Sequence, residues 1–239
     1  MLLRNKKNIT SNEELTASYD RLYEGFLKEN STVLEAEFML SMLKFTRGQT
    51  LLDVSSGKGD LVAAAQALGL EAVGIELSRT AIALANQSHP HCKFLHANAE
   101  SLPFPTGSFD FVMNLGSLEH YLDPQKAALE MARVLKPMGR AVILLPNSHD
   151  ILTFYQILVH GKGPDDLQDF ERFASRMEWS DFLSQNGFEI LETHKFDREL
   201  SRKPFRLFNF AYNALMNYIP LNLSRVFVFV CGKKTPTSA

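Results

Sequence analysis

Short apolar runs alternate with amphipathic segments through most of the chain. The runs have the length and composition of buried strands, and they lie at 50–54, 71–76, 93–96, 109–113 and 141–145. Segments between them place apolar residues at helical spacing, as in an alanine-rich stretch over 60–68. Because strand and helix alternate in this order, the pattern predicts an α/β fold with a parallel, doubly wound sheet.

Capping residues mark where several predicted helices begin. These signals are Thr32 with Glu35, Ser78, Asp123 with Pro124, and Ser175 with Glu178. The helices they open are predicted to end near Gly48, near Pro90, within 136–139 and at Asn186-Gly187. In the less regular final third, we expect strands at 188–193 and 224–231, with a long aromatic helix over 203–222.

Composition narrows the class of protein. The chain has 239 residues, 45% of them hydrophobic, and its 25 basic against 27 acidic side chains give a net charge of −2. A general nucleic-acid binder carries a basic excess, so we expect no nucleic-acid partner. Two cysteines are too few for a disulfide scaffold, and no run approaches the ~18 apolar residues of a membrane helix. The first residues lack a signal-peptide core, so we expect a cytoplasmic protein.

No segment has the composition of an interdomain linker. We therefore expect a single domain over 1–239, with N-terminal helices over 1–47 and a ligand-binding core over 48–145. Residues 146–239 would then supply insertions and the last strands of the sheet.

The loop after the first predicted strand has the features of a cofactor site. Gly57 and Gly59 follow Asp53 closely, and glycines at such a turn let a ligand approach bare backbone. Glu76 ends the next strand, 17 residues after Gly59. A carboxylate at that place can accept hydrogen bonds from both hydroxyls of a ribose, which indicates a nucleoside-containing cofactor.

The residues around this loop favour one cofactor over another. A dinucleotide fingerprint requires a third glycine, and Val62 occupies that position. Asp60 and Asp53 would repel a pyrophosphate dianion, whereas they tolerate the cationic sulfonium and ammonium groups of S-adenosylmethionine. The electrostatics therefore favour S-adenosylmethionine, and an NAD-dependent oxidoreductase is the weaker alternative.

Four motifs follow one another along the predicted core: LDVSSGKG at 52–59, VGIELS at 73–78, HANAESLPF at 96–104, and SFDF at 108–111 with LEH at 118–120 and ARVLKPMG at 132–139. In this order they resemble the motifs of the class I S-adenosylmethionine-dependent methyltransferases of the small-molecule type. The resemblance covers roughly 48–145. It implies a Rossmann-like, mostly parallel seven-stranded sheet with helical insertions near the acceptor site, S-adenosyl-L-methionine as cofactor and S-adenosyl-L-homocysteine as product.

The same resemblance implies which residues hold the cofactor. They are Tyr19, Asp53, Ser55, Ser56, Gly57, Gly59, Glu76, Leu77, Asn98, Ala99, Glu100, Asn114, Leu115 and Gly116. Ser55 stands where the family has glycine, and Asn98 stands where it has aspartate. These departures keep open a second hypothesis, a catalytically silent relative that acts through protein contacts. Tyr19 and Tyr23, on a predicted helix, either cover the cofactor as a lid or pack against the sheet.

Methyl transfer needs a base when the acceptor is a hydroxyl or an activated carbon. His120, beside Glu119, is the candidate catalytic base; the alternative is that both residues only orient the loop. His89, His91 and His96 cluster with Cys92, but no carboxylate joins them at ligand spacing. We therefore expect a solvated turn with no metal there.

Two segments are expected to choose the acceptor, 147–173 and 203–222. The second combines an aromatic stripe with arginines just upstream. It either lies on a membrane surface or closes over a lipophilic acceptor, or it packs on the sheet or a second subunit. The acceptor, the atom that is methylated and the oligomeric state stay open.

Overall fold

A seven-stranded sheet forms the centre of the protein. The computed structural model describes residues 1–25, 33–161, 169–196 and 218–235. The strands of the sheet follow the order β4-β3-β2-β5-β6-β9-β8. Their bounds are β2 (Thr50–Val54), β3 (Glu71–Glu76), β4 (Lys93–His96), β5 (Phe109–Leu115), β6 (Leu135–Pro146), β8 (Phe188–Lys195) and β9 (Val226–Lys233).

The first five of these strands run parallel, whereas β9 is antiparallel to both of its neighbours, β6 and β8. The fold class expected from the sequence is therefore confirmed. The chain moves from β2 outward to β3 and β4, and then returns to the other side of β2 to form β5. In such sheets the crevice at the carboxyl ends of the two strands flanking the reversal binds ligands, which places a site at β2 and β5.

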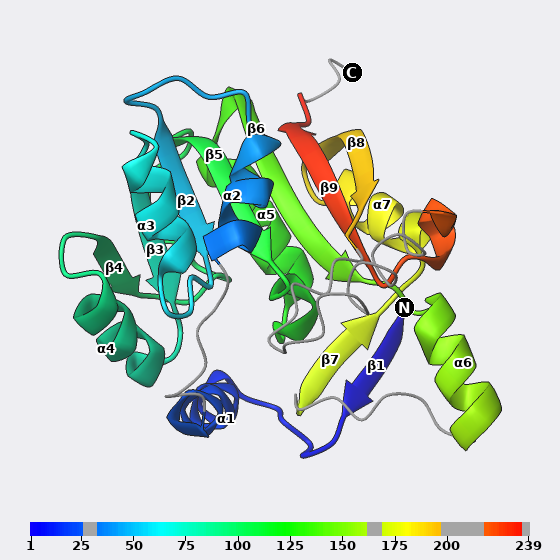
Figure 1. Cartoon of the computed structure of the whole chain (residues 1–239). Coiled ribbons are helices and arrows are strands. Elements are labelled where there is room, and N and C mark those ends of the chain that lie inside the picture. Colours follow the sequence, from blue (N-terminus) through cyan, green and yellow to red (C-terminus); the bar gives the residue numbers. More distant parts are fainter. Residues whose placement is uncertain (26–32, 162–168, 197–217, 236–239) are drawn as a thin grey trace.

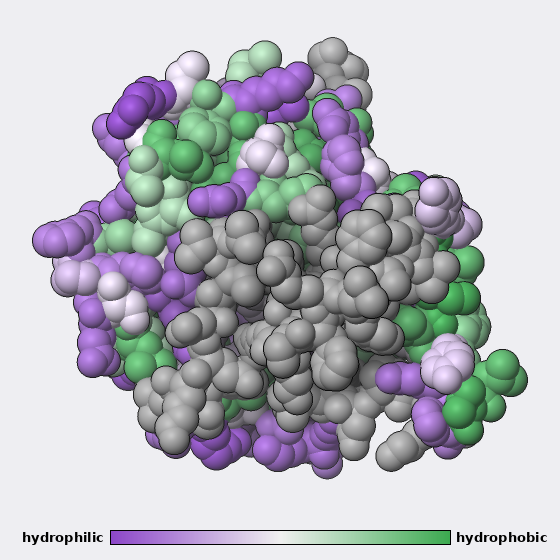
Figure 2. Space-filling view, in the orientation of Figure 1, coloured by the Kyte–Doolittle hydropathy of each residue, from purple (hydrophilic) through white to green (hydrophobic). Residues whose placement is uncertain are grey.

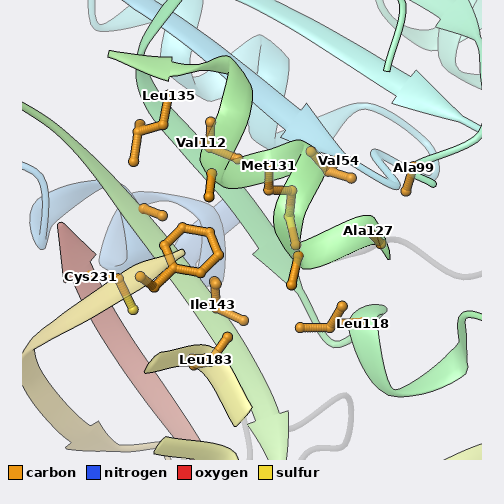
Figure 3. Packing of buried hydrophobic residues seen from close by; sticks show 14 of the residues in the cluster. Val54, Ala99, Val112, Leu118, Ala127, Met131, Leu135, Ile143, Leu183 and Cys231 are labelled. Atoms are coloured by element: carbon orange, nitrogen blue, oxygen red, sulfur yellow. The ribbon is translucent and has the colours of Figure 1, made fainter. Parts of the chain in front are cut away.

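Helices cover both faces of this sheet (Figure 1). They are α2 (Val33–Ser41), α3 (Asp60–Ala67), α4 (Arg79–Ser88), α5 (Pro124–Val134) and α7 (Arg176–Gln185). Alternate residues of each strand enter different cores: Leu52 packs with the α5 and α7 side, and Leu51 with the α2 and α3 side. Figure 3 shows the first core, where Met131 of α5 lies among Val112 and Ile143 of neighbouring strands.

Most local signals in the sequence are confirmed. The predicted strands at 50–54, 71–76 and 93–96 have the bounds of β2, β3 and β4. Ser78 and Asp123 cap their helices through side-chain oxygens, and Ser175 with Glu178 forms a complete capping box. Thr32 and most of the predicted helix over 203–222 lie outside the described residues.

Two boundaries were wrong. The helix predicted to end near Gly48 ends at Ser41, where the amides of Met42 and Leu43 bond to the carbonyls three residues back. The helix predicted to reach 136–139 ends at Val134, because β6 begins at Leu135, before Pro137. Leu135 pairs with Phe109, and the register shifts before pairing resumes at Arg140 and Phe111. A β-bulge therefore accommodates a segment whose proline and glycine indicate a turn.

A second, two-stranded sheet was not predicted from the sequence. In it, β1 (Leu2–Asn5) pairs antiparallel with β7 (Phe170–Phe173), so that Leu2 lies opposite Phe173. The N-terminal segment thereby lies beside the insertion that follows β6 (Figure 1). The insertion also contains α6 (Ile151–His160), which was not predicted as a helix. Within the described ranges, no helix is long and apolar enough to cross a membrane.

Candidate active site

The loop after β2 is shaped by two glycines in the left-handed region. Gly57 has a φ of 52° and Gly59 a φ of 84°, values that other residues adopt at a cost. A Cβ added at Gly59 would lie 2.3 Å from the ring of Phe94 on β4, and one at Gly57 would lie 2.8 Å from the hydroxyl of Tyr23. Glycine is therefore required at position 59 both by the backbone angle and by the close approach of Phe94.

Glu76, at the end of β3, ties this loop to the next one. Its Oε2 accepts the amide proton of Gly57 at 3.0 Å, and its Oε1 accepts those of Leu77 and Ser78 at 2.7 and 2.9 Å. Burial raises the pKa of Glu76, and these three amides partly oppose the rise. Oε1 thereby accepts two hydrogen bonds, whereas Oε2 accepts one and keeps a lone pair for a ribose hydroxyl.

Asp53 adds a second buried carboxyl group to the site. Burial together with the nearby Glu76 raises the pKa of Asp53 from 3.8 to about 8. Two buried carboxyl groups at the ends of β2 and β3 favour a ligand that brings positive charge. S-adenosylmethionine has such a charge and a ribose as well, so the donor set fits this cofactor and disfavours a pyrophosphate.

A hydrogen-bonded cluster joins β2, β5 and the turn η1 (Leu118–His120). The Tyr121 hydroxyl lies 2.7 Å from Ser55 Oγ and accepts a hydrogen bond of 2.7 Å from Asn114 Nδ2. The amide of Asn114 also donates to the carbonyl of Val54 and accepts from the backbone of Leu118. Ser55 has a φ of 66°, which is a strained backbone angle for a residue other than glycine. The contact between its Oγ and the Tyr121 hydroxyl helps to hold it there. Leu115 ends β5, and Gly116 follows it with a φ of 69°.

The segment expected to contact adenine forms a tight turn. The side-chain oxygen of Asn98 accepts the amide proton of Glu100 at 2.9 Å. Ala99 is buried, and Glu100 accepts from the backbone of Asp123 at 3.0 Å, at the start of α5. The amide group of Asn98 therefore has a fixed direction, with one of its oxygen lone pairs already used.

Helix α1 (Asn12–Gly25) lies against the same region. Asp20 accepts hydrogen bonds from the Ser78 hydroxyl and the Thr80 amide, which attaches α1 to the start of α4. Burial raises the pKa of Tyr19 and Tyr23, and the carboxylates of Glu119 and Glu76 add to the rise for Tyr19. Both tyrosines thus lie among the acidic residues of the site, as a covering helix would place them.

His120 is buried rather than open to an entering acceptor. Its Nδ1 donates to the carbonyl of Phe170 in β7 at 2.7 Å, which leaves Nε2 without the proton. Burial lowers the pKa of His120 to about 4, and burial raises that of the adjoining Glu119 to about 8. At neutral pH the imidazole is therefore neutral and the Glu119 carboxyl readily holds a proton.

Three residues of this region were missed by reasoning from the sequence. Tyr121 directly follows His120 and Asp20 directly follows Tyr19, but their hydrogen-bond partners, Ser55 and Ser78, lie far from them in the sequence. Glu171 lies in β7, and its side chain approaches Glu119 and His120 only through the fold. No local spacing signals such contacts. His89 was expected on a solvated turn. Its Nε2 lies 3.0 Å from Asp60 Oδ1, so the ring is paired with a side chain of α3.

Comparison with known proteins agrees with this geometry. A family model described as a methyltransferase domain matches residues 52–143. A demethylmenaquinone methyltransferase of Bacillus licheniformis is 30% identical over 151 residues, which cover 58% of this chain and 65% of that protein. The O-methyltransferase rstn1 of Aspergillus nomiae is 32% identical over 166 residues, covering 63% of this chain and 68% of the relative.

The fold is similar to that of an S-adenosylmethionine dependent methyltransferase from Mesorhizobium loti, with a TM-score of 0.62 and 16% identity over 82% of this chain and 96% of that one. The chain belongs to the class I S-adenosylmethionine-dependent methyltransferases. Its matches span about half to two thirds of the first curated relatives, 48% and 65% of the length of two of them.

Proposed function

We propose that this protein transfers a methyl group from S-adenosylmethionine to a small, lipophilic acceptor, and that 1–239 works as one domain. The observation that carries the proposal is Glu76, a buried carboxylate that holds the glycine loop by the Gly57 amide and keeps acceptor capacity for a ribose. When bound, the cofactor supplies a methyl group on a positively charged sulfur, an excellent leaving group.

The chain then has to bind, orient and shield the reactants. In this proposal Glu76 holds the ribose, Asn98 accepts from the adenine amino group, and the loop at 55–57 lies along the methionine end. Tyr19 and Tyr23 of α1 exclude water from above. Asp53 favours the cationic donor over the neutral-sulfur product, because a buried carboxylate gains most from a nearby positive charge.

Two features support a lipophilic acceptor. A cavity of about 250 Å³ beside Tyr19 has a mixed lining, which would suit an acceptor with an apolar body and a polar group. Its apolar side chains are Ile9, Leu15, Leu22 and Phe170, and its polar ones include Lys7, Ser18, Arg21 and Asp169. Separately, α6 carries exposed apolar side chains, among them Leu158 at 86%, and apolar atoms appear toward the lower right of Figure 2. The similarity to a demethylmenaquinone methyltransferase and an O-methyltransferase supports an acceptor of the quinol or phenol class. Contact of the chain with a membrane surface would bring such an acceptor to the site.

His120 acts in this proposal by holding η1 in place rather than as the catalytic base. A base works best when its pKa lies near the working pH, and that of His120 is lowered to about 4. Its Nδ1 bond to Phe170 joins η1 to β7. We also propose that the chain works in a reducing compartment such as the cytoplasm, since Cys92 and Cys231 are free thiols.

Calorimetric titration with S-adenosylmethionine and S-adenosylhomocysteine tests the donor site. Glu76→Ala should weaken binding by at least about tenfold, since one hydrogen bond to a charged acceptor contributes about 1.5–3 kcal/mol. Glu71→Ala is the matched control, because Glu71 is exposed at the opposite end of the same strand. Equal affinities in the two variants would refute the placement of the site.

Labelled methyl transfer tests the acceptor class. The purified chain is incubated with methyl-labelled cofactor and with either a lipid extract or an aqueous metabolite fraction. Label in the lipid extract is the expected result, and label only in the aqueous fraction would contradict a lipophilic acceptor. Cofactor binding without transfer to either fraction would favour the silent relative, and binding of NAD alone would favour an oxidoreductase.

A further inference from the structure

Glu119, His120 and Glu171 form a compact group of metal-ligating side chains. Glu119 and His120 belong to η1 and Glu171 to β7, so two separate segments contribute. One ligand atom from each residue lies within 4.8 Å of the others, a spacing that a single ion can bridge. None of the three was expected to bind a metal from the sequence, and methyl transfer as proposed above does not use them as a group.

The imidazole of His120 is oriented as in metal sites. Its Nδ1 donates to the Phe170 carbonyl at 2.7 Å, and its Nε2 lies 3.6 Å from Glu119 Oε1. Histidines that bind metals commonly donate the other ring N–H to a carbonyl or carboxylate, which fixes the ring and its tautomer. Nε2 thereby keeps its lone pair for a cation, on the ring edge that lies 3.6 Å from Glu119 Oε1.

Glu119 provides an independent indication that a ligand belongs here. Its side chain is 5% exposed, and its Oε2 makes no hydrogen bond with any residue in the part of the chain that the structure describes. A buried carboxylate oxygen without a partner is costly, because it has lost its hydration. Coordination to a cation removes this cost directly.

The two segments are held in place before any ion binds. Arg172 donates to the carbonyls of Tyr121 and Leu122, the latter at 3.1 Å, and its guanidinium lies 4.8 Å from the ring centre of Phe170. These contacts fasten β7 to the residues after η1. The ligand atoms therefore need little rearrangement to close on an ion, and little ordering entropy is lost.

We propose that Glu119, His120 and Glu171 bind one divalent transition-metal ion, of the Mn²⁺ or Zn²⁺ class, that joins η1 to β7. A mixed set of one imidazole and two carboxylates suits these ions, whereas Mg²⁺ prefers oxygen ligands and retains its water. Three protein ligands leave at least one coordination position open. The ion would lie near Gly116, since a Cβ built there is 3.7 Å from Glu119 Oε1.

The test is whether the tag-free, chelator-treated chain binds Mn²⁺. Binding is measured by calorimetry and by the loss of the free Mn²⁺ signal in electron paramagnetic resonance. Mn²⁺ is chosen because a thiol such as Cys92 binds it weakly. We expect one ion per chain and a higher melting temperature when it is bound. Glu119→Gln and Glu171→Gln should each weaken binding by about tenfold or more.

Glu192→Gln is the matched control, because Glu192 forms a similar pair with His194, at 2.9 Å, on the exposed part of β8. This variant should bind Mn²⁺ as the unmodified chain does. Failure of the unmodified chain to bind Mn²⁺, or unchanged binding in both Glu119→Gln and Glu171→Gln, would overturn the proposal. Titration of the same samples with S-adenosylmethionine shows that each variant is folded, and it separates a failed ion site from a failed donor site.

Discussion

Replacing Tyr121 by phenylalanine removes one oxygen atom from a buried cluster that joins three parts of the candidate site. Asn114 Nδ2 then keeps only its bond to the Val54 carbonyl, and Ser55 Oγ loses its partner. Two lost hydrogen bonds and one buried N–H left unsatisfied cost about 2–3 kcal/mol of the free energy of unfolding. Tyr155→Phe, on the exposed face of α6, is the control and should change it by less than about 0.5 kcal/mol.

Ser55→Gly turns this prediction into a double-mutant cycle. Glycine relieves the strain of a backbone φ of 66° at position 55, which is worth about 1 kcal/mol. When Tyr121 is present, the substitution also removes the hydrogen bond between Ser55 and the Tyr121 hydroxyl. The two effects nearly cancel, so Ser55→Gly alone should leave stability within about 1 kcal/mol.

In the Tyr121→Phe background there is no bond left to lose, and Ser55→Gly should stabilise the chain by about 1 kcal/mol. Urea unfolding of the four proteins at constant m value measures these differences. Additive effects of the two substitutions would refute the reasoning, because they would mean that the Ser55 hydroxyl gains nothing from Tyr121.

Two further predictions concern the donor loop. The pKa of Asp53 is about 8 in the folded chain, against an ordinary value of 3.8. The folded chain therefore binds this proton more tightly than the unfolded chain does. The resulting contribution to the free energy of unfolding is complete below about pH 4 and is lost as the pH rises to about 8. Asp53→Asn should therefore lower the dependence of unfolding free energy on pH between 5 and 8, and an unchanged dependence would contradict the assignment. Gly59→Ala should destabilise more than Gly107→Ala in thermal melting, because both glycines have positive φ but only Gly59 faces Phe94 at 2.3 Å; equal losses would mean that Phe94 yields freely.

Local chemistry accounts for what could be predicted. Strands β2, β3 and β4 are short apolar runs, and the caps at Ser78, Asp123 and Ser175 satisfy backbone groups within three residues of themselves. These interactions depend on neighbours in the chain, so the sequence displays them directly. Glu76 belongs with them, since it ends a strand whose place beside β2 follows from the alternation of strand and helix.

The contacts that the sequence does not display depend on distant partners. Strand β1 has little apolar alternation of its own, and its pairing with β7 exists only because the insertion after β6 returns to the N-terminal segment. The boundary between α5 and β6 likewise differs from the predicted one, because pairing of β6 with β5 outweighs the turn preference of Pro137.

The alternating α/β order, the helix caps and the acidic, glycine-containing donor loop can all be predicted from the order of residues along the chain. The contact of Tyr121 with Ser55, and that of Glu171 with Glu119 and His120, arise only when the chain has folded. The burial that lowers the pKa of His120 and raises that of Glu119 is also a property of the packed protein alone. The physical reason is that periodicity and capping act over a few residues, whereas burial, charge coupling and side-chain partners arise when segments far apart in the chain exclude water together.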